Sequence, residues 1–220
     1  MSDALHGKRI VNTRATHQAH ALNAILSQQG ALVLEYPCIA IVPPPDTHAL
    51  DSALRDLISG AYEWLLLTSA NTVYALAQRL ADLRLTLDDA PIRAAAVGMS
   101  TAESAREHLH LHDVLLPAEY IAEALAEALP VTPLSRVLLP ESAIAPPTLA
   151  DLLTARGAQV TVVEAYQNVT GTGGVDLVAA LAGGQVDALT FTSASTVAGL
   201  VERLQPHTGA LDTARDICAA

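Results

Sequence analysis

The sequence predicts an α/β protein made of two flavodoxin-like lobes with parallel sheets, and three observations support this prediction. Strand-like and helix-like segments alternate along the 220 residues, which is typical of parallel sheets covered by helices. Apolar residues make up 51% of the chain but aromatic residues only 3%, which suits helices packed closely on sheets. Two segments of the first half also recur in the second half, which indicates an internal duplication.

The repeat has two parts with nearly equal offsets. The segment KRIVNTRATHQAHALNAILSQQGALVLEY, from Lys8, is similar to SRVLLPESAIAPPTLADLLTARGAQVTVVEAY, so that Gly30 aligns with Gly157 at an offset of 127. The segment WLLLTSANTVYALAQRL is similar to ALTFTSASTVAGLVERL, which aligns Thr68 with Thr192 at an offset of 124. Duplicated α/β halves usually enclose a cleft, which we expect to hold a ligand.

The second copy is expected to be C-terminally incomplete. A strand is expected from Arg93 in the first copy, and the matching segment ARDICAA starts near Arg215. We therefore expect a strand at the C-terminus and a repeat that lacks roughly 30–40 residues, a size set by the first copy. The alternative is a naturally short chain with an unfinished sheet edge.

The individual elements follow from the apolar pattern. Short β-branched or aliphatic runs predict strands, whereas apolar residues at helical spacing, often ended by glycine, predict helices. The expected strands are 9–13, 32–35, 64–67, 93–97, 114–116, 137–139, 160–163 and 189–192. The expected helices are 16–29, 48–58, 71–80, 101–109, 121–129, 148–156, 175–181 and 196–204.

These elements divide into two lobes and a linker. We expect lobe 1, the incomplete one, to comprise residues 1–36 and 171–220, and lobe 2 to comprise residues 46–163. Residues 37–45 and 164–170 are expected as two extended linker strands, because Pro43-Pro44-Pro45 stiffens the first of them.

Composition narrows the class of function. The net charge of −11 and the lack of a basic run argue against a nucleic-acid surface. No secretory leader is visible at Met1–Thr13, and no apolar run approaches the ~20 residues that span a bilayer. Cys38 and Cys218 are the only cysteines and form no CxxC motif, so a reducing cytoplasm is expected rather than a disulfide framework.

Several common motifs are absent or incomplete. Gly171-Thr172-Gly173-Gly174 has Asp176 in place of the third glycine of a dinucleotide fingerprint, and neither a P-loop nor a nucleophile elbow is present. His108, His110 and His112 would share one face of a strand and suit Zn²⁺. A solvated strand face or helix end is the simpler interpretation of these histidines.

Four loops join a strand end to a helix start and are rich in hydroxyls or amides: 12–14, 68–71, 98–101 and 192–195. Ligands bind at such positions in parallel sheets, although Ser, Thr and Asn also cap helices without a ligand. The TSAN and TSAS loops are favoured because the motif occurs twice. Tyr166 follows a strand where the chain leaves one lobe, and its phenol would pack there or donate a proton to a leaving group.

Seven segments, in order, resemble uroporphyrinogen-III synthase. They are VNTR with GALVLEYPCIAIVPP, then WLLLTSANTV, AAVGMSTAE, LLPAEYIAEAL, RVLLPES, GAQVTVVEAYQNV and LTFTSASTV. The resemblance runs from Lys8 to Ala220, and the last family loop, an IGxxT-like segment, would begin after Ala220. It implies a bilobal fold with a two-stranded linker.

The resemblance also implies a reaction and its site. The family is a cyclising hydro-lyase of porphyrin and heme biosynthesis that dehydrates hydroxymethylbilane and closes it with inversion of ring D to give uroporphyrinogen III. Catalysis would be mainly positional. Tyr166 would be the candidate general acid. Candidate substrate-binding residues are Arg14, Thr68, Ser69, Asn71, Gly98, Met99, Ser100, Thr101, Thr192, Ser193 and Ser195.

No metal or organic cofactor is expected, and no nucleic acid or membrane partner. The resemblance implies a cytoplasmic monomer that would accept its substrate from hydroxymethylbilane synthase. Two departures stand out: Glu141 replaces a frequent Arg after LLP, which weakens or moves a carboxylate contact, and Ala15 replaces a common Pro.

Other functions remain open at this point. The missing loop and Glu141 motivate a non-catalytic tetrapyrrole- or metabolite-binding bilobal α/β module. A periplasmic-type or regulatory binding protein would need a leader or a DNA-binding tail, and neither is visible. A third alternative is an acidic α/β protein whose loops only cap helices.

Overall fold

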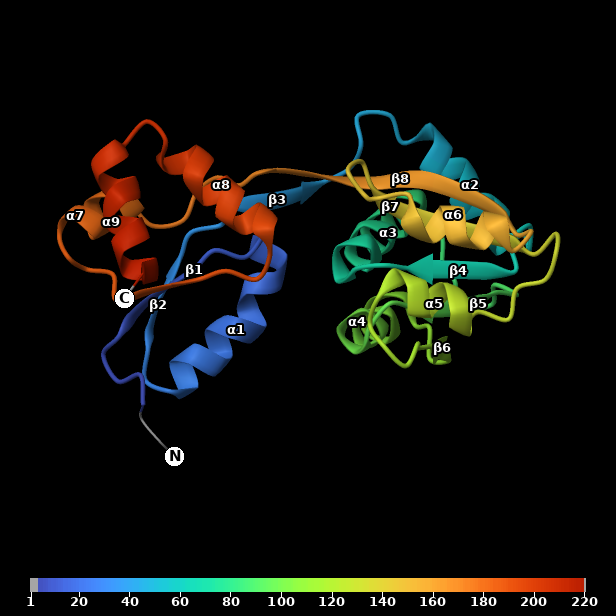
Figure 1. Ribbon diagram of the computed structural model, residues 1–220, viewed down its shortest axis with the longest axis horizontal. Helices are drawn as coiled ribbons and strands as arrows, with labels where there is room; N and C mark the ends of the chain where they lie inside the picture. The colour runs from blue at the N-terminus through green and yellow to red at the C-terminus, as the bar shows by residue number, and fades with distance from the viewer. Residues whose placement is uncertain (1–3, 220) are drawn as a thin grey trace. The chain divides into compact units, whose positions relative to one another are not determined.

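The computed structural model describes residues 4–219, which form an α/β fold with two compact units (Figure 1). Unit 1 consists of the described parts of Met1–Ile41 and Asn168–Ala220, and unit 2 consists of Val42–Gln167. Each unit has its own sheet, its own helices and its own apolar core. The prediction of an α/β fold is therefore confirmed.

Unit 1 contains a three-stranded parallel sheet in the order β2-β1-β9. Its strands are β1 (Arg9–Asn12), β2 (Leu32–Glu35) and β9 (Ala188–Thr190). Its helices are α1 (Thr16–Gln28), α7 (Leu177–Ala182), α8 (Ala194–Leu204) and α9 (Thr208–Ala219). Val11 of β1 packs with Leu181 and Leu200 in one core cluster, whereas Ile10 packs with Leu26 in another. Adjacent residues of β1 thus bury opposite faces of the sheet.

The strand expected near Arg215 is wrong, because this segment belongs to helix α9. Leu211, Ala214 and Ile217 recur every third residue, and all three pack against the core of unit 1. A strand would send alternate residues to opposite faces, so these three side chains would not share one. Helical spacing therefore decides the structure of this segment, of which Ala220 lies outside the described residues.

Unit 2 is built on a larger sheet, in the order β3-β8-β7-β4-β5-β6. The strands of this sheet are β3 (Ile39–Val42), β4 (Trp64–Leu67), β5 (Arg93–Ala96), β6 (Val114–Leu115), β7 (Arg136–Ser142) and β8 (Gln159–Thr170). Most of β3 and the last three residues of β8 are counted with unit 1. Its helices are α2 (His48–Ile58), α3 (Ala70–Leu83), α4 (Met99–Leu109), α5 (Ala122–Ala128) and α6 (Thr148–Ala155). β8 is one continuous strand of 12 residues, although the sequence suggested a short strand followed by a linker.

From β8 to β6, neighbouring strands of this sheet are parallel. Counted along the chain from β4, their order is 5-4-1-2-3, so the sheet is doubly wound. The flavodoxin order 2-1-3-4-5 appears when counting starts at β7 instead. Unit 2 is therefore a circular permutation of the flavodoxin order. All four residues of β4 are buried, as expected for a central strand covered on both faces.

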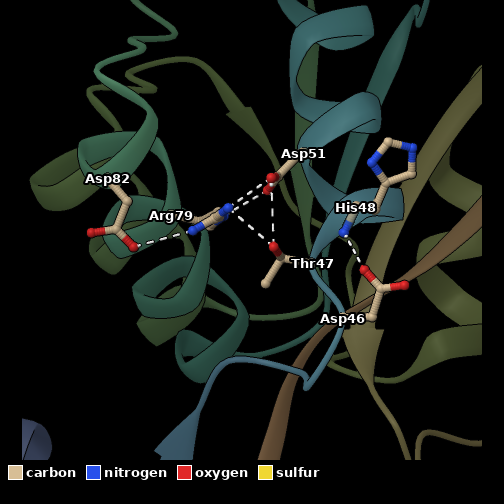
Figure 2. Close-up of polar contacts among 6 residues, drawn as sticks. All are labelled: Asp46, Thr47, His48, Asp51, Arg79 and Asp82. Carbon is tan, nitrogen blue, oxygen red and sulfur yellow. Dashed lines mark hydrogen bonds and ion pairs between the residues drawn. The ribbon is translucent and has the colours of Figure 1, made fainter.

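Helices α2 and α3 are joined by a polar cluster around Arg79 (Figure 2). The Arg79 guanidinium donates to both carboxylate oxygens of Asp51, with N–O distances of 2.6 Å, and to Thr47 Oγ1 at 3.0 Å. These hydrogen bonds from Arg79 hold the pKa of Asp51 below its usual range. Such two-pronged pairs fix orientation as well as adding attraction. The Arg79 donors thus bind acceptors within the cluster, and the cluster joins α2 to α3.

The glycine-rich segment after β8 has a steric role. A Cβ on Gly171 would lie 2.2 Å from the carbonyl oxygen of Pro37, and one on Gly174 would lie 2.4 Å from that of Glu35. Gly174 also has a φ of +85°, which side chains rarely adopt. Close backbone packing within unit 1 thus explains these glycines without a nucleotide.

The three histidines of HLHLHD do not share a strand face. His108 lies in the last turn of α4, His110 ends that helix with a left-handed φ of 56°, and His112 follows in a loop. His110 Nδ1 lies 2.9 Å from Asp88 Oδ1. Within residues 4–219, no three His, Cys, Asp or Glu side chains are grouped to hold a metal ion.

Cys38 and Cys218 are both free, and burial raises the pKa of the Cys38 thiol to about 12. Cys38 is therefore a packing residue rather than a nucleophile. None of the helices in the described part of the chain has the length and apolar character needed to cross a membrane.

Candidate functional site

The strand order of unit 2 creates a switch point between β4 and β7. From β4 the chain continues through β5 and β6 on one side of the sheet, and then returns to β7 on the other side. Loops leaving the carboxyl ends of β4 and β7 therefore run in opposite directions. In open α/β sheets, ligands bind in the crevice that this divergence leaves.

A hollow of about 630 Å³ lies at this edge of the sheet. Thr68 and Val97 line it directly after β4 and β5, and Glu141 and Ser142 line it from the end of β7. The segment around Tyr120, which leads into α5, forms another wall. The volume is in the range usual for small-molecule sites, and all its lining residues belong to unit 2.

The hollow has large apolar side chains at its margin. Ile144 is 78% exposed, Tyr120 58% and Ile121 48%, and all three line the hollow. A cluster of exposed apolar side chains costs solvation free energy, and such clusters commonly mark binding sites. A ligand that covers them would gain hydrophobic stabilisation here.

Glu141 brings a carboxyl group into this environment. The residue is only 7% exposed, and it lines both the large hollow and a neighbouring one of about 260 Å³. None of the described residues donates a hydrogen bond to its side chain in this structure. Burial alone raises the pKa of Glu141, because removing a carboxylate from water disfavours its charged form.

The phenol of Tyr166 is held at the same edge. Tyr166 OH lies 3.2 Å from Ser69 Oγ, and Ser69 Oγ also accepts a hydrogen bond from the N–H of Thr72 at 3.1 Å. Ser69 is thus the N-cap of α3. Tyr166 is 6% exposed and lies opposite Ser142 in the β7–β8 register. The sheet and the helix cap together fix the position of the phenol.

The other predicted site residues of unit 2 lie on two neighbouring loops. Thr68 lines the hollow, and Asn71 lies in the first turn of α3, partly buried. Gly98 is the N-cap of α4, and a Cβ there would lie 3.3 Å from Tyr120 Cγ. Met99 and Ser100 are exposed at the start of α4, whereas Thr101 is 7% exposed. The Gly98 loop therefore contacts the Tyr120 wall directly.

The remaining predicted residues belong to unit 1. Arg14 follows β1, and its Nε is buried without a hydrogen-bond partner. Ser193 caps α8 by accepting from the N–H of Thr196 at 3.3 Å. Ser193 Oγ also lies 2.9 Å from Ser195 Oγ, and Thr192 is exposed beside them. Two predicted groups of site residues thus occur, one in each unit.

Of the residues that line the hollow, only Thr68 was among the predicted site residues, and Glu141, Tyr120 and Ile144 are the most notable of those that were not. Tyr120 lies in the LLPAEYI segment that helped to carry the family resemblance. Glu141 was noted only as a departure from the family pattern. An acidic residue at the end of a buried aliphatic run, here Val137–Leu139 followed by Pro140, was the signal available for it.

Fold and geometry together define a doubly wound α/β protein with a candidate small-molecule site at the carboxyl edge of its sheet. A family model described as uroporphyrinogen-III synthase HemD matches residues 20–220. The chain therefore belongs to the uroporphyrinogen-III synthase family, and the resemblance seen in the sequence is confirmed.

Individual proteins agree with this assignment. The uroporphyrinogen-III synthase of Synechococcus elongatus is 33% identical over 209 residues, which cover 93% of this chain and 78% of the relative. The porphyrin biosynthesis protein HemD of Ruminiclostridium josui is 29% identical, over 93% of this chain but only 41% of its own length. A crystal structure of a mutant Thermus thermophilus uroporphyrinogen III synthase has a TM-score of 0.54 at 24% identity, over 89% of this chain and 77% of that one. It supports the fold.

Proposed function

We propose that this protein is a uroporphyrinogen-III synthase that dehydrates hydroxymethylbilane and closes it, with inversion of ring D, to uroporphyrinogen III. Membership of the family over residues 20–220 carries this proposal. The hollow at the switch point of unit 2 supports it, because it offers an apolar wall for pyrrole rings. We expect the enzyme to work in the cytoplasm as a monomer and without a cofactor.

In this proposal Tyr166 is the general acid. The C–O bond of the hydroxymethyl group breaks, and the phenol donates its proton so that the oxygen leaves as water. The phenol regains a proton when the attacked ring carbon releases its own. The hydrogen bond between Tyr166 OH and Ser69 Oγ would orient the phenol, and Ser69 is itself fixed by its capping contact with Thr72.

Substrate binding must be local, since the protein and the substrate are both acidic. The protein carries a net charge of −11, and hydroxymethylbilane carries eight carboxylates, so long-range attraction is not expected. We propose that carboxylates bind at Arg14, whose Nε has no partner, and at the helix N-termini of α3, α4 and α8. α4 has no side-chain cap, which leaves its first N–H groups available for an anion.

The proposed function is tested by analysing product isomers. Hydroxymethylbilane is generated in the presence of the purified 220-residue protein, and the oxidised products are separated into the I and III isomers. An excess of the III isomer over a reaction without enzyme is expected. Production of the I isomer alone, at the spontaneous rate, would contradict the proposal.

We also propose that the two units arose by internal duplication and that residues 37–45 and 164–170 link them. The pairing registers support this origin. Arg9 pairs with Leu32 in unit 1 and Arg136 with Gln159 in unit 2, both shifted by 127. Ile10 pairs with Ala188 in unit 1, and Val137 pairs with Trp64 in unit 2. Val137 is the repeat equivalent of Ile10, and Trp64 is the repeat equivalent of Ala188.

A further inference from the structure

The matching registers assign Glu141 and Arg14 to equivalent positions. Arg9 and Arg136 start the two equivalent strands, and both Arg14 and Glu141 are five residues further along. The same place at the carboxyl edge of a sheet therefore carries a cation in unit 1 and an acid in unit 2. The repeat itself does not require a particular charge here.

Both side chains are incompletely satisfied inside the protein. Arg14 Nε is buried and has no hydrogen-bond partner. Glu141 is 7% exposed, and no side chain or backbone N–H among the described residues donates to its carboxylate. Buried polar groups normally have partners, since leaving one unpaired costs free energy. Arg14 Nε thus lacks a partner among the described residues, and the Glu141 carboxylate, which lines the hollow, is available to accept a hydrogen bond from a ligand.

The surroundings of Glu141 decide which ligand atoms suit it. The titratable residues that line the two hollows around it are Tyr120, Glu123 and Glu164. In the described chain, α2, α3 and α6 place no charged side chain in either hollow. A carboxylate of the ligand would therefore meet only like charges and apolar walls, whereas an N–H donor would find a free acceptor.

Hydroxymethylbilane offers both kinds of group, with carboxylates on its side chains and an N–H on each pyrrole ring. We propose that the Glu141 carboxylate accepts a hydrogen bond from a pyrrole N–H of the bound bilane, at the end of β7 where Glu141 lines the hollow. This inference rests on the proposed function. It assigns the acidic hollow of unit 2 to the pyrrole backbone and Arg14 to the carboxylate side chains.

The first test replaces Glu141 by glutamine, which keeps the size of the side chain and removes its charge. Because a hydrogen bond to a charged acceptor is stronger than one to a neutral acceptor, kcat/KM for III-isomer formation is expected to fall about fivefold to tenfold in E141Q. Glu127→Gln removes one charge from an exposed position of α5 and serves as the matched control, with an expected change below about twofold.

A pH profile separates this role from a structural one. As the pH falls through the raised pKa of Glu141, the wild-type carboxylate becomes neutral and its advantage over E141Q is expected to disappear. The carboxylates of the substrate titrate equally with both proteins and cancel in the ratio. If the ratio of kcat/KM between the wild type and E141Q is near one at every pH, the inference is overturned.

The charge-reversed variant tests the opposite assignment. In E141R a cation faces the pyrrole N–H, so kcat/KM is expected to fall more than in E141Q. A rise in kcat/KM in E141R would show that the hollow takes a carboxylate and would overturn the inference. If the wild-type protein forms only the I isomer, both the proposed function and this inference fail, whereas III-isomer formation that E141Q leaves unchanged overturns this inference alone.

Discussion

In unit 1 the strand β1 leads into Thr13-Arg14, and in unit 2 the equivalent strand β7 ends with Pro140-Glu141-Ser142. Both strands pair with their neighbours in the same register. The sheets around them are thus built alike, while the side chains presented at the carboxyl edge have opposite charge. Strand pairing depends on backbone hydrogen bonds, which leave the edge residues free to differ.

The tyrosines that follow β2 and lie in β8 show a similar contrast. Both Tyr36 and Tyr166 are 6% exposed. Arg203 stacks on the Tyr36 ring with its guanidinium carbon 3.5 Å from the ring centre, and it donates to the carbonyl oxygen of Pro37 at 2.5 Å. Tyr166 instead bonds through its hydroxyl to Ser69. One tyrosine is therefore packed into a structural contact, and the other presents its phenol beside a loop of the site.

The helix caps are the part that the two units share most closely. Ser69 and Ser193 have nearly the same backbone angles, with φ of −155° and −161°, and each accepts from the N–H three residues later. A cap satisfies donors of its own helix whatever the ligand. Repetition of TSAN and TSAS is thus explained by structure alone, and differences between the units are the better guide to the site.

The largest effect is expected when the two tyrosines are compared. Tyr166→Phe removes the proposed acid, and kcat for III-isomer formation is expected to fall about 100-fold, within the range of general acid catalysis. Tyr36→Phe removes the same hydroxyl from unit 1 and is expected to change kcat less than about twofold. The measurement is the initial rate of III-isomer formation; equal rates in the two variants would refute a role for Tyr166 in proton transfer.

The next effect concerns Arg14. Arg14→Gln removes a cation whose Nε has no partner in the protein, and we expect KM for hydroxymethylbilane to rise about tenfold with kcat nearly unchanged. Arg215→Gln, on the exposed surface of α9 in the same unit, is the control for net charge. If both variants raise KM equally, Arg14 has no specific contact with the substrate.

The two helix caps provide a smaller and more symmetrical test. Ser69→Ala and Ser193→Ala each remove an N-cap, and each is expected to lower the free energy of unfolding by about 1 kcal/mol. In S69A, kcat is also expected to fall severalfold, because Tyr166 loses its hydrogen-bond partner. Thermal unfolding and kinetics of both variants check this. A fall in kcat in S193A as large as in S69A would contradict the role given to Ser69 alone, that of orienting Tyr166.

The smallest effect is a change of stability at Glu141. Because its pKa is raised in the folded state, the folded protein binds the proton more tightly than the unfolded chain. Native stability attributable to this group therefore decreases as the pH rises from the usual range of Glu towards the raised value, and stays lowered above it. E141Q is expected to melt a few degrees higher than wild type at neutral pH, with the gap closing in acid. A lower melting temperature for E141Q at neutral pH would contradict this.

Many elements of the fold could be predicted from local sequence patterns. The apolar run Trp64–Leu67 predicted a buried strand, and the spacing of Leu22 and Leu26 after Ala19 predicted a helix; both are present. Helix α9 was missed because the alignment with Arg93 outweighed the three-residue spacing of Leu211, Ala214 and Ile217. The segment is helical because these three side chains pack together on the core of unit 1. An alignment between the two repeats does not show which core a segment packs on.

For the site, the sequence identified the loops but not their surroundings. It determined the family, the alternation of strands and helices, and the side chains that follow each strand, because these depend on neighbours along the chain. Tertiary structure alone decided that Ser69 meets Tyr166, 97 residues away, and that Glu141 is buried beside the hollow. Burial, and with it the pKa of a carboxyl group, depends on side chains brought together from distant parts of the chain, so it is a property of the folded protein.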